Sequence, residues 1–238
     1  MEDHKLNYLK QEFVTREGSI HCISLEKGYE EYEKFIDMSL HTMLAFNNEI
    51  PEDEDTKSIQ YLGIRFVNSV FSMKQLLLNG YYQSAFMLLR DLIETGFLME
   101  YFLHYPSKIG GWRNDSANSS WEFSPKNIRG KLDKKEMRDS LYKIYSEIAI
   151  HPRWEGIKLV SKDGVMQPVP EFIPSYLILG LENLAKLVPY YCRIYIYFIK
   201  SDDPEVQDLK NEFNIYYDMK QKEGYFQLFR VFQKNVNI

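Results

Sequence analysis

The segment at residues 80–105 reads GYYQSAFMLLRDLIETGFLMEYFLHY, and it decides the fold class. At 100° per residue, its apolar side chains fall on two opposite faces of one helix. The face expected to form core carries Ala85, Leu88, Leu89, Leu92, Gly96, Met99 and Leu103. Because a helix that is apolar all round is normally buried, the segment predicts a central helix from Tyr82 to about Tyr105 in a mainly all-α protein.

The flanking sequence repeats apolar residues at three- and four-residue spacing, which predicts a helical bundle. The Asn79-Gly80 pair ends a helix that begins near Thr56, and so short a link makes this helix and the next antiparallel neighbours. Five or six helices are expected in all. The others cover about residues 25–48, 127–150 with a break near Gly130, 174–200 with a kink near Pro189, and 204–222.

Two segments depart from the helical pattern. Residues 106–126 hold Trp112 and Trp121 among Gly, Ser and Pro, which predicts an ordered loop. Residues 155–170, EGIKLVSKDGVMQPVP, place β-favouring runs on either side of Asp163-Gly164, a hairpin signal.

The expected architecture is therefore a helical bundle with a small β-hairpin inserted near residues 157–169. We expect one domain over residues 1–238, with its core at about 25–222 and residues 1–24 as an N-terminal extension.

Composition narrows the class of protein. The 238 residues include 29 Lys and Arg against 34 Asp and Glu, a net charge of −5 that disfavours non-specific coating of nucleic acid. Cys22 and Cys192 lack the paired spacing of a disulfide framework or a zinc site. The N-terminus lacks the apolar region of a signal peptide, and the most apolar stretch, Ile173 to Ile199, is interrupted by charges. We expect a cytoplasmic protein without a membrane span.

No motif predicts a cofactor or a metal. The chain has no Gly-rich phosphate loop and no nucleophile elbow. Glu100 with His104, and Glu147 with His151, are spaced one residue wider than the familiar di-iron motif, so ordinary helix contacts are expected there.

Arg90 and Glu94 are the first candidate site residues. Their i,i+4 spacing on the second face of the central helix lets the side chains meet. Burial of either charge costs several kcal/mol unless the charge is paired. One interpretation is an ion pair that ties the helix to its neighbours. The other is that Arg90 projects into a cleft and binds an anionic group such as phosphate.

His151 is the second candidate. In SLYKIYSEIAIHPRW, residues 140–154, a helix is expected to end at this histidine because proline follows it. His151 either caps the helix or supplies a proton-transfer or phosphate-contacting group beside Arg90 and Glu94.

The runs GYYQSA and LRDLIE, residues 80–85 and 89–94, followed by LYKIYS at 141–146 and by His151-Pro152, resemble a group of bacterial helical proteins similar to the HEPN superfamily. The resemblance covers about residues 55–200. It implies a bundle in which Arg90, Glu94, Ser146 and His151 share a polar cluster. It also implies a role linked to RNA, in stress or phage defence.

HEPN ribonucleases carry an Arg followed by four to six residues and then a His. The match in this chain, TREGSIH from Arg16 to His21, contains Gly18 and Ser19 and makes a poor helix. The resemblance therefore implies the fold more strongly than RNA cleavage. If the chain is catalytic, His151 exchanges the proton, Arg90 stabilises phosphate charge and Glu94 completes the site.

A basic segment follows the loop, KNIRGKLDKKEMR at residues 126–138. Its basic residues are Lys126, Arg129, Lys131, Lys134, Lys135 and Arg138. They form either a solvated helix face or a contact for RNA phosphates or an acidic partner, with the tryptophans as base-stacking surfaces nearby.

Two classes of function remain open. The first is a HEPN-like protein that binds RNA or a nucleotide-containing ligand, with ribonuclease-like chemistry if catalytic. The second is a non-catalytic interaction module, in which the cluster is structural and the aromatic C-terminal third recruits a protein partner or forms a homodimer. Solvent access to Arg90 separates them, because a cleft favours ligand binding.

Overall fold

Helices dominate the computed structural model, which describes residues 2–25, 27–115, 121–132, 142, 145–146, 154–162, 164–167 and 169–225. Eight α-helices lie in these ranges: α1 Glu2–Leu25, α2 Lys27–Asn47, α3 Glu54–Leu78, α4 Tyr82–His104, α5 Ile109–Arg113, α6 Pro125–Leu132, α8 Pro174–Phe198 and α9 Pro204–Lys222. Short 3₁₀ helices cover Pro106–Lys108 (η1), Trp121–Phe123 (η2) and Trp154–Val160 (η4). The mainly all-α prediction is confirmed.

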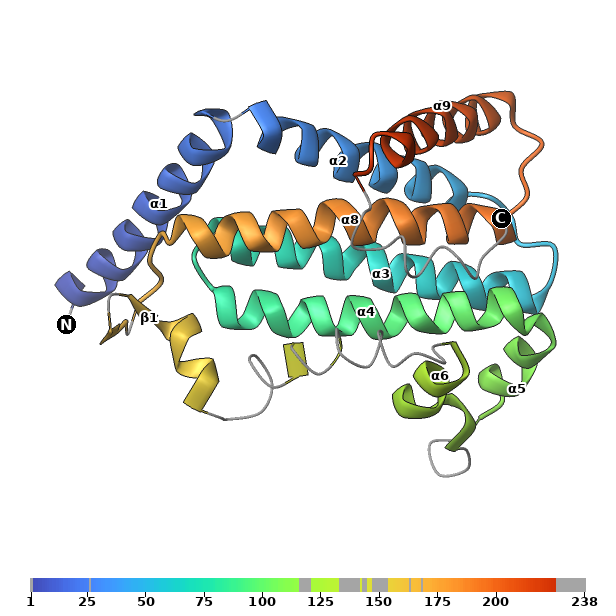
Figure 1. The fold of residues 1–238 in the computed structure, drawn as a ribbon, viewed down its shortest axis with the longest axis horizontal. Helices are drawn as coiled ribbons and strands as arrows, with labels where there is room; N and C mark the ends of the chain where they lie inside the picture. Colours follow the sequence, from blue (N-terminus) through green and yellow to red (C-terminus); the bar gives the residue numbers. More distant parts are fainter. Residues whose placement is uncertain are drawn as a thin grey trace.

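The α3–α4 connection is the tight turn that Asn79-Gly80 predicts. Gly80 has a φ of 80°, its N–H donates to the Leu77 carbonyl at 3.2 Å, and the Tyr81 N–H donates to Leu76 at 2.9 Å. This pair of bonds satisfies the last carbonyls of α3 through a left-handed residue, a conformation that glycine adopts without strain. The two helices consequently run antiparallel, side by side, through the middle of the molecule (Figure 1).

The expected burial of α4 on both faces is confirmed. α3, α8 and α6 pack around it, and the second face buries Phe86, Phe97, Tyr101 and Phe102. The approach to α8 is close, since a Cβ added at Gly96 would lie 2.3 Å from ring atoms of Tyr191.

α8 lies in the core between α2, α3 and α4 (Figure 1). It continues as one helix through Pro189 and buries Tyr190, Tyr191 and Tyr195, so packing accounts for these aromatic residues. α9 lies over α2, where the buried ammonium of Lys220 pairs with Glu31.

The N-terminal region differs from expectation, because residues 2–25 form a helix of their own. This helix contains Arg16 to His21, so the expectation that Gly18 and Ser19 make that segment a poor helix is wrong. The apolar residues of α1 are spread around it rather than gathered on one face, so helical periodicity gives no signal there. Thr15 nevertheless donates to the Pro170 carbonyl at 3.2 Å, and Arg16 donates to Gln75 at 2.8 Å. These contacts attach α1 to the end of the bundle, from which it leans outward (Figure 1).

The predicted hairpin is confirmed but short. β1 (Ser161–Lys162) pairs antiparallel with β2 (Val165–Met166) across a turn in which Gly164 has a φ of 78°. The apolar run before it, η4, is helical rather than extended.

The loop at residues 106–126 is built largely from short helices. Trp112 packs against Phe102 with ring centroids 5.6 Å apart, as an ordered loop requires. Trp121, by contrast, is 76% exposed and is not packed into the core. In the described part of the chain, no helix has the length and apolar character needed to cross a membrane.

We predict that Gly96→Ala lowers the free energy of unfolding by about 1–3 kcal/mol, because the new methyl group collides with the Tyr191 ring. Gly130→Ala on α6 is the control, since a methyl group added there meets no atom within 4 Å and alanine favours a helix. Urea unfolding followed by circular dichroism measures both. Equal stability of the two variants would contradict close packing of α4 on α8.

Candidate functional site

Arg90 is the centre of a polar cluster on α4. Its Nη2 lies 2.8 Å from Glu94 Oε1, its Nε donates to Ser146 Oγ at 3.1 Å, and its Nη2 also donates to the Tyr142 hydroxyl. The structure thus brings Arg90, Glu94 and Ser146 together from segments far apart in the chain. His151 lies outside the described residues, and its role stays a prediction.

Tyr142 is the member of this cluster that sequence reasoning missed. Two guanidinium groups lie over its ring, with the central carbon of Arg90 4.8 Å and that of Arg129 3.6 Å from the ring centroid. Such stacking stabilises both cations. Tyr142 stands four residues before Ser146, the same i,i+4 spacing that pairs Arg90 with Glu94. This spacing was the one sequence feature that could have indicated that Tyr142 and Ser146 share a helix face.

The cluster is partly open to solvent. The side chains of Arg90 and Glu94 are 25% and 23% exposed. A guanidinium has five N–H donors, and the Nη1 amino group of Arg90 has no hydrogen-bond partner among the described residues. Arg90 is therefore oriented by its described neighbours, while one of its amino groups makes no hydrogen bond to them.

A cavity of about 200 Å³ adjoins the cluster, between α3, α4, α5 and α6. Glu94 lines it, as do the aromatic residues Tyr61, Trp112 and Phe123. The cavity also has a charged wall, where Arg65 of α3 pairs with Asp91 of α4. Because Glu94 belongs to both the cluster and this wall, the cluster is not sealed inside the bundle.

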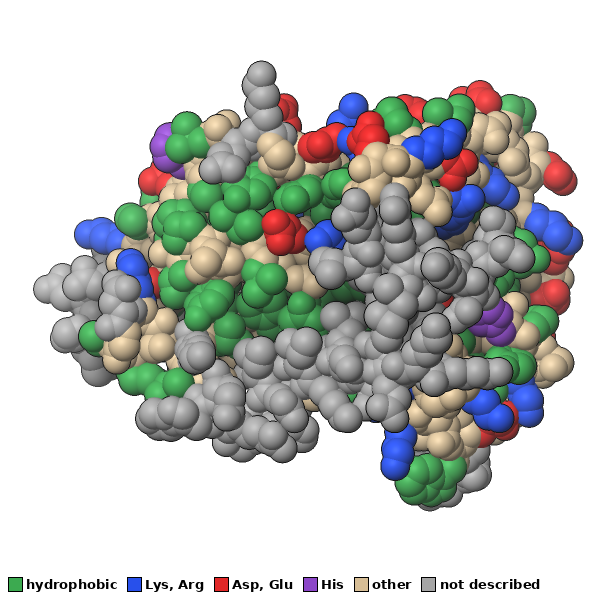
Figure 2. Space-filling view, viewed as in Figure 1, with side chains coloured by type: hydrophobic (Ala, Val, Ile, Leu, Met, Phe, Trp, Pro, Cys, Tyr) green, Lys and Arg blue, Asp and Glu red, His purple; other side chains and the backbone are tan. Residues whose placement is uncertain are grey.

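The basic segment divides into buried and exposed positions. Lys126 and Lys131 are exposed on α6, whereas Arg129 is 8% exposed beneath Tyr142. Figure 2 shows Lys and Arg side chains at the lower right, where Figure 1 places α5 and α6. The other three predicted contacts, Lys134, Lys135 and Arg138, lie outside the described residues.

Of the two weaker metal candidates, Glu147 with His151 lies outside the described residues, and Glu100 and His104 do not converge. Glu100 is buried and accepts a hydrogen bond from the Tyr190 hydroxyl at 3.1 Å, while His104 is exposed at the end of α4. Within the ranges that the structure describes, no three His, Cys, Asp or Glu side chains gather as metal ligands would.

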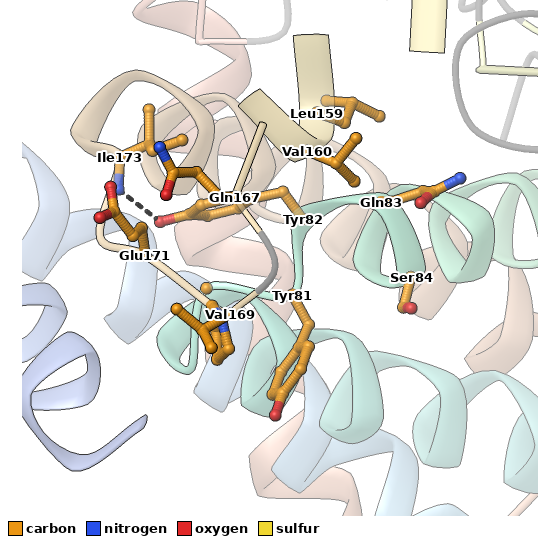
Figure 3. Close-up of a pocket in the computed structure, with 12 residues that line it drawn as sticks. Tyr81, Tyr82, Gln83, Ser84, Leu159, Val160, Gln167, Val169, Glu171 and Ile173 are labelled. Carbon is orange, nitrogen blue, oxygen red and sulfur yellow. Dashed lines mark hydrogen bonds between the residues drawn. The ribbon is translucent and has the colours of Figure 1, made fainter. Parts of the chain in front are cut away.

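A second cavity, of about 150 Å³, lies at the other end of α4 (Figure 3). The Tyr82 hydroxyl accepts a hydrogen bond from the Ile173 N–H at 2.9 Å, which joins α4 to the segment before α8. Burial raises the pKa of Tyr82 to about 12. Tyr82 therefore has a structural role, because it packs in the core and holds α4 to the segment before α8.

Comparison with known proteins identified no relative of this chain. A scan against protein-family models and searches of curated proteins and of solved structures found no match to this chain. The HEPN-like interpretation therefore depends on the sequence motifs alone.

We predict that alkali destabilises the fold through Tyr82. The folded pKa is about 12 and the unfolded value about 10, so the contribution of Tyr82, up to about 2–3 kcal/mol, is complete below pH 10 and is lost as the pH rises towards 12. Tyr82→Phe should make this decline in unfolding free energy shallower, although it removes the bond to Ile173. Exposed Tyr197 provides the control, since Tyr197→Phe should leave the decline unchanged. Parallel declines for all three proteins in urea unfolding would refute the assignment.

Proposed function

We propose that this chain is a HEPN-like RNA-binding protein that contacts an RNA phosphate through Arg90. The observation that carries the proposal is the partly exposed Arg90 guanidinium, whose Nη1 amino group has no partner among the described residues while its other nitrogens are held in place.

This arrangement suits a phosphate. A planar guanidinium binds phosphate oxygens with directed, charge-assisted hydrogen bonds. Ser146, Tyr142 and Glu94 orient Arg90 before any ligand arrives, which reduces the entropy lost on binding. A second guanidinium, that of Arg129, lies over the Tyr142 ring beside Arg90.

The surroundings favour RNA over a free anion. Exposed Lys126 and Lys131 on α6 can contact further phosphates, and aromatic rings line the adjoining cavity. Phosphate contacts combined with aromatic surfaces are typical of proteins that bind single-stranded nucleic acid. The acidic net charge of the chain disfavours RNA binding over its whole surface. The binding we propose therefore uses the one face that carries Arg90, Lys126 and Lys131.

The competing interaction module requires a cluster that is structural only. Glu94 instead lines a cavity, and this supports a ligand site. Cleavage of the bound RNA would require a proton-transfer group, for which His151 is the candidate from the sequence. The resemblance suggests cytoplasmic action in bacterial stress or phage defence.

The test is fluorescence anisotropy with a short labelled single-stranded RNA of mixed sequence. We expect Arg90→Ala to weaken binding about tenfold or more and Arg90→Lys to weaken it less, because lysine keeps the charge and loses the planar donors. Arg193→Ala is the matched control, since Arg193 on α8 is 22% exposed, close to the 25% of Arg90, and pairs with Asp218 of α9 rather than with the cluster.

Thermal melting establishes that each variant is folded. If folded Arg90→Ala binds RNA as tightly as the parent, the proposal is wrong. If the parent does not bind RNA, the interaction module becomes the better interpretation. Loss of RNA cleavage in His151→Ala, with binding retained, would make the protein a ribonuclease.

A further inference from the structure

The cavity beside the cluster combines flat aromatic walls with both kinds of hydrogen-bonding group. Tyr61 and Trp112 lie 6.5 Å apart between ring centroids, with planes 37° apart, and Phe123 adds a third ring. Aromatic surfaces of this kind stack well on a planar heterocycle. The volume of about 200 Å³ is below the ~300–1,000 Å³ of sites for drug-sized molecules. It fits one ring system rather than a whole nucleotide.

Glu94 has unused acceptor capacity on this wall. Its Oε1 is buried 2.8 Å from Arg90 Nη2 but out of line for a hydrogen bond, and Oε2 accepts none from the described residues. A carboxylate only accepts hydrogen bonds. The ligand that complements Glu94 therefore presents N–H donors.

Arg65 offers the opposite chemistry. It lines the same cavity, and its side chain remains 48% exposed although it pairs with Asp91. Asp91 is less available than Glu94, because its two oxygens accept from Arg65 and from Ser69, the latter at 3.2 Å. The complementary ligand also presents acceptors.

The local charge is balanced. Arg65 and Arg90 offset Asp91 and Glu94, so neither a cation nor an anion gains net attraction inside the cavity. The ligand is therefore neutral and planar, with adjacent donors on one edge and acceptors on another. Guanine meets these conditions, since it has N1–H and N2–H donors next to the O6 and N7 acceptors that arginine binds in nucleic acids.

We propose that this cavity binds a guanine base, stacked on its aromatic walls, with Glu94 Oε2 accepting from N1–H and N2–H and Arg65 donating to O6 or N7. The inference rests on the proposed RNA-binding function for the source of the base. A free guanine nucleotide presents the same ring and is the other source.

The experiment compares oligoadenylate RNAs that carry one central guanosine, inosine or adenosine. Inosine lacks the N2 amino group and adenosine lacks both donors. We expect the guanosine RNA to bind about tenfold or more tightly than the adenosine RNA, with inosine between them, because each lost hydrogen bond to a charged group weakens binding severalfold or more.

Two variants locate this preference. Glu94→Gln should reduce the guanosine preference severalfold, because an amide presents one acceptor where the carboxylate presents two, and Glu205→Gln on exposed α9 should retain it. Tyr61→Leu, at a residue 57% exposed and so tolerant of change, should weaken binding of the guanosine RNA severalfold. Thermal melting again shows that the variants are folded.

Calorimetric titration with guanosine monophosphate separates this inference from the proposed function. RNA binding that depends on Arg90 but is equal for all three RNAs, without nucleotide binding, overturns the guanine site and leaves RNA binding intact. Absence of RNA binding together with nucleotide binding that Glu94→Gln weakens overturns RNA binding and supports the site with a free nucleotide as ligand. If neither ligand binds, both proposals are wrong.

Discussion

The packing of α4 on opposite faces is the constraint on which the rest of the structure depends. The Gly80 turn brings α3 against α4, α8 approaches α4 closely at Gly96, and α6 packs on part of its second face. Burying apolar side chains stabilises the bundle by about 25 cal/mol per Å² of surface removed from water. The same packing leaves the side chains of Arg90 and Glu94 only 25% and 23% exposed, and a partly buried charge is costly unless it is paired.

The polar cluster provides partners for these partly buried charges. Ser146 and Tyr142 supply acceptors for Arg90, and Arg129 stacks on the Tyr142 ring. A purely structural cluster would satisfy every donor and exclude water. This one leaves part of Arg90 exposed and places Glu94 on a cavity wall, which connects the packing of α4 to a surface that a ligand can reach.

The site and the cavity have different electrostatic characters, and together they match different parts of one molecule. At the cluster the guanidinium of Arg90 is partly exposed, and a guanidinium suits a phosphate. Around the cavity the opposite charges of Arg65, Asp91, Glu94 and Arg90 balance, and aromatic rings provide the remaining surface. A nucleotide in RNA has both corresponding parts, a charged phosphate and a neutral, flat base.

The amino-acid sequence by itself determined the helices that have strong periodicity and clear end signals, including α4, α9 and the Gly80 turn, because these depend on residues within a few turns of one another. It also singled out Arg90 and Glu94 through their i,i+4 spacing. Only the tertiary structure decided that the Tyr142 ring contacts two guanidinium groups, that Arg129 is buried rather than solvated, and that α1 is a helix held by contacts to Pro170 and Gln75. Those contacts join separate elements of the chain, and no local pattern specifies which distant side chains meet.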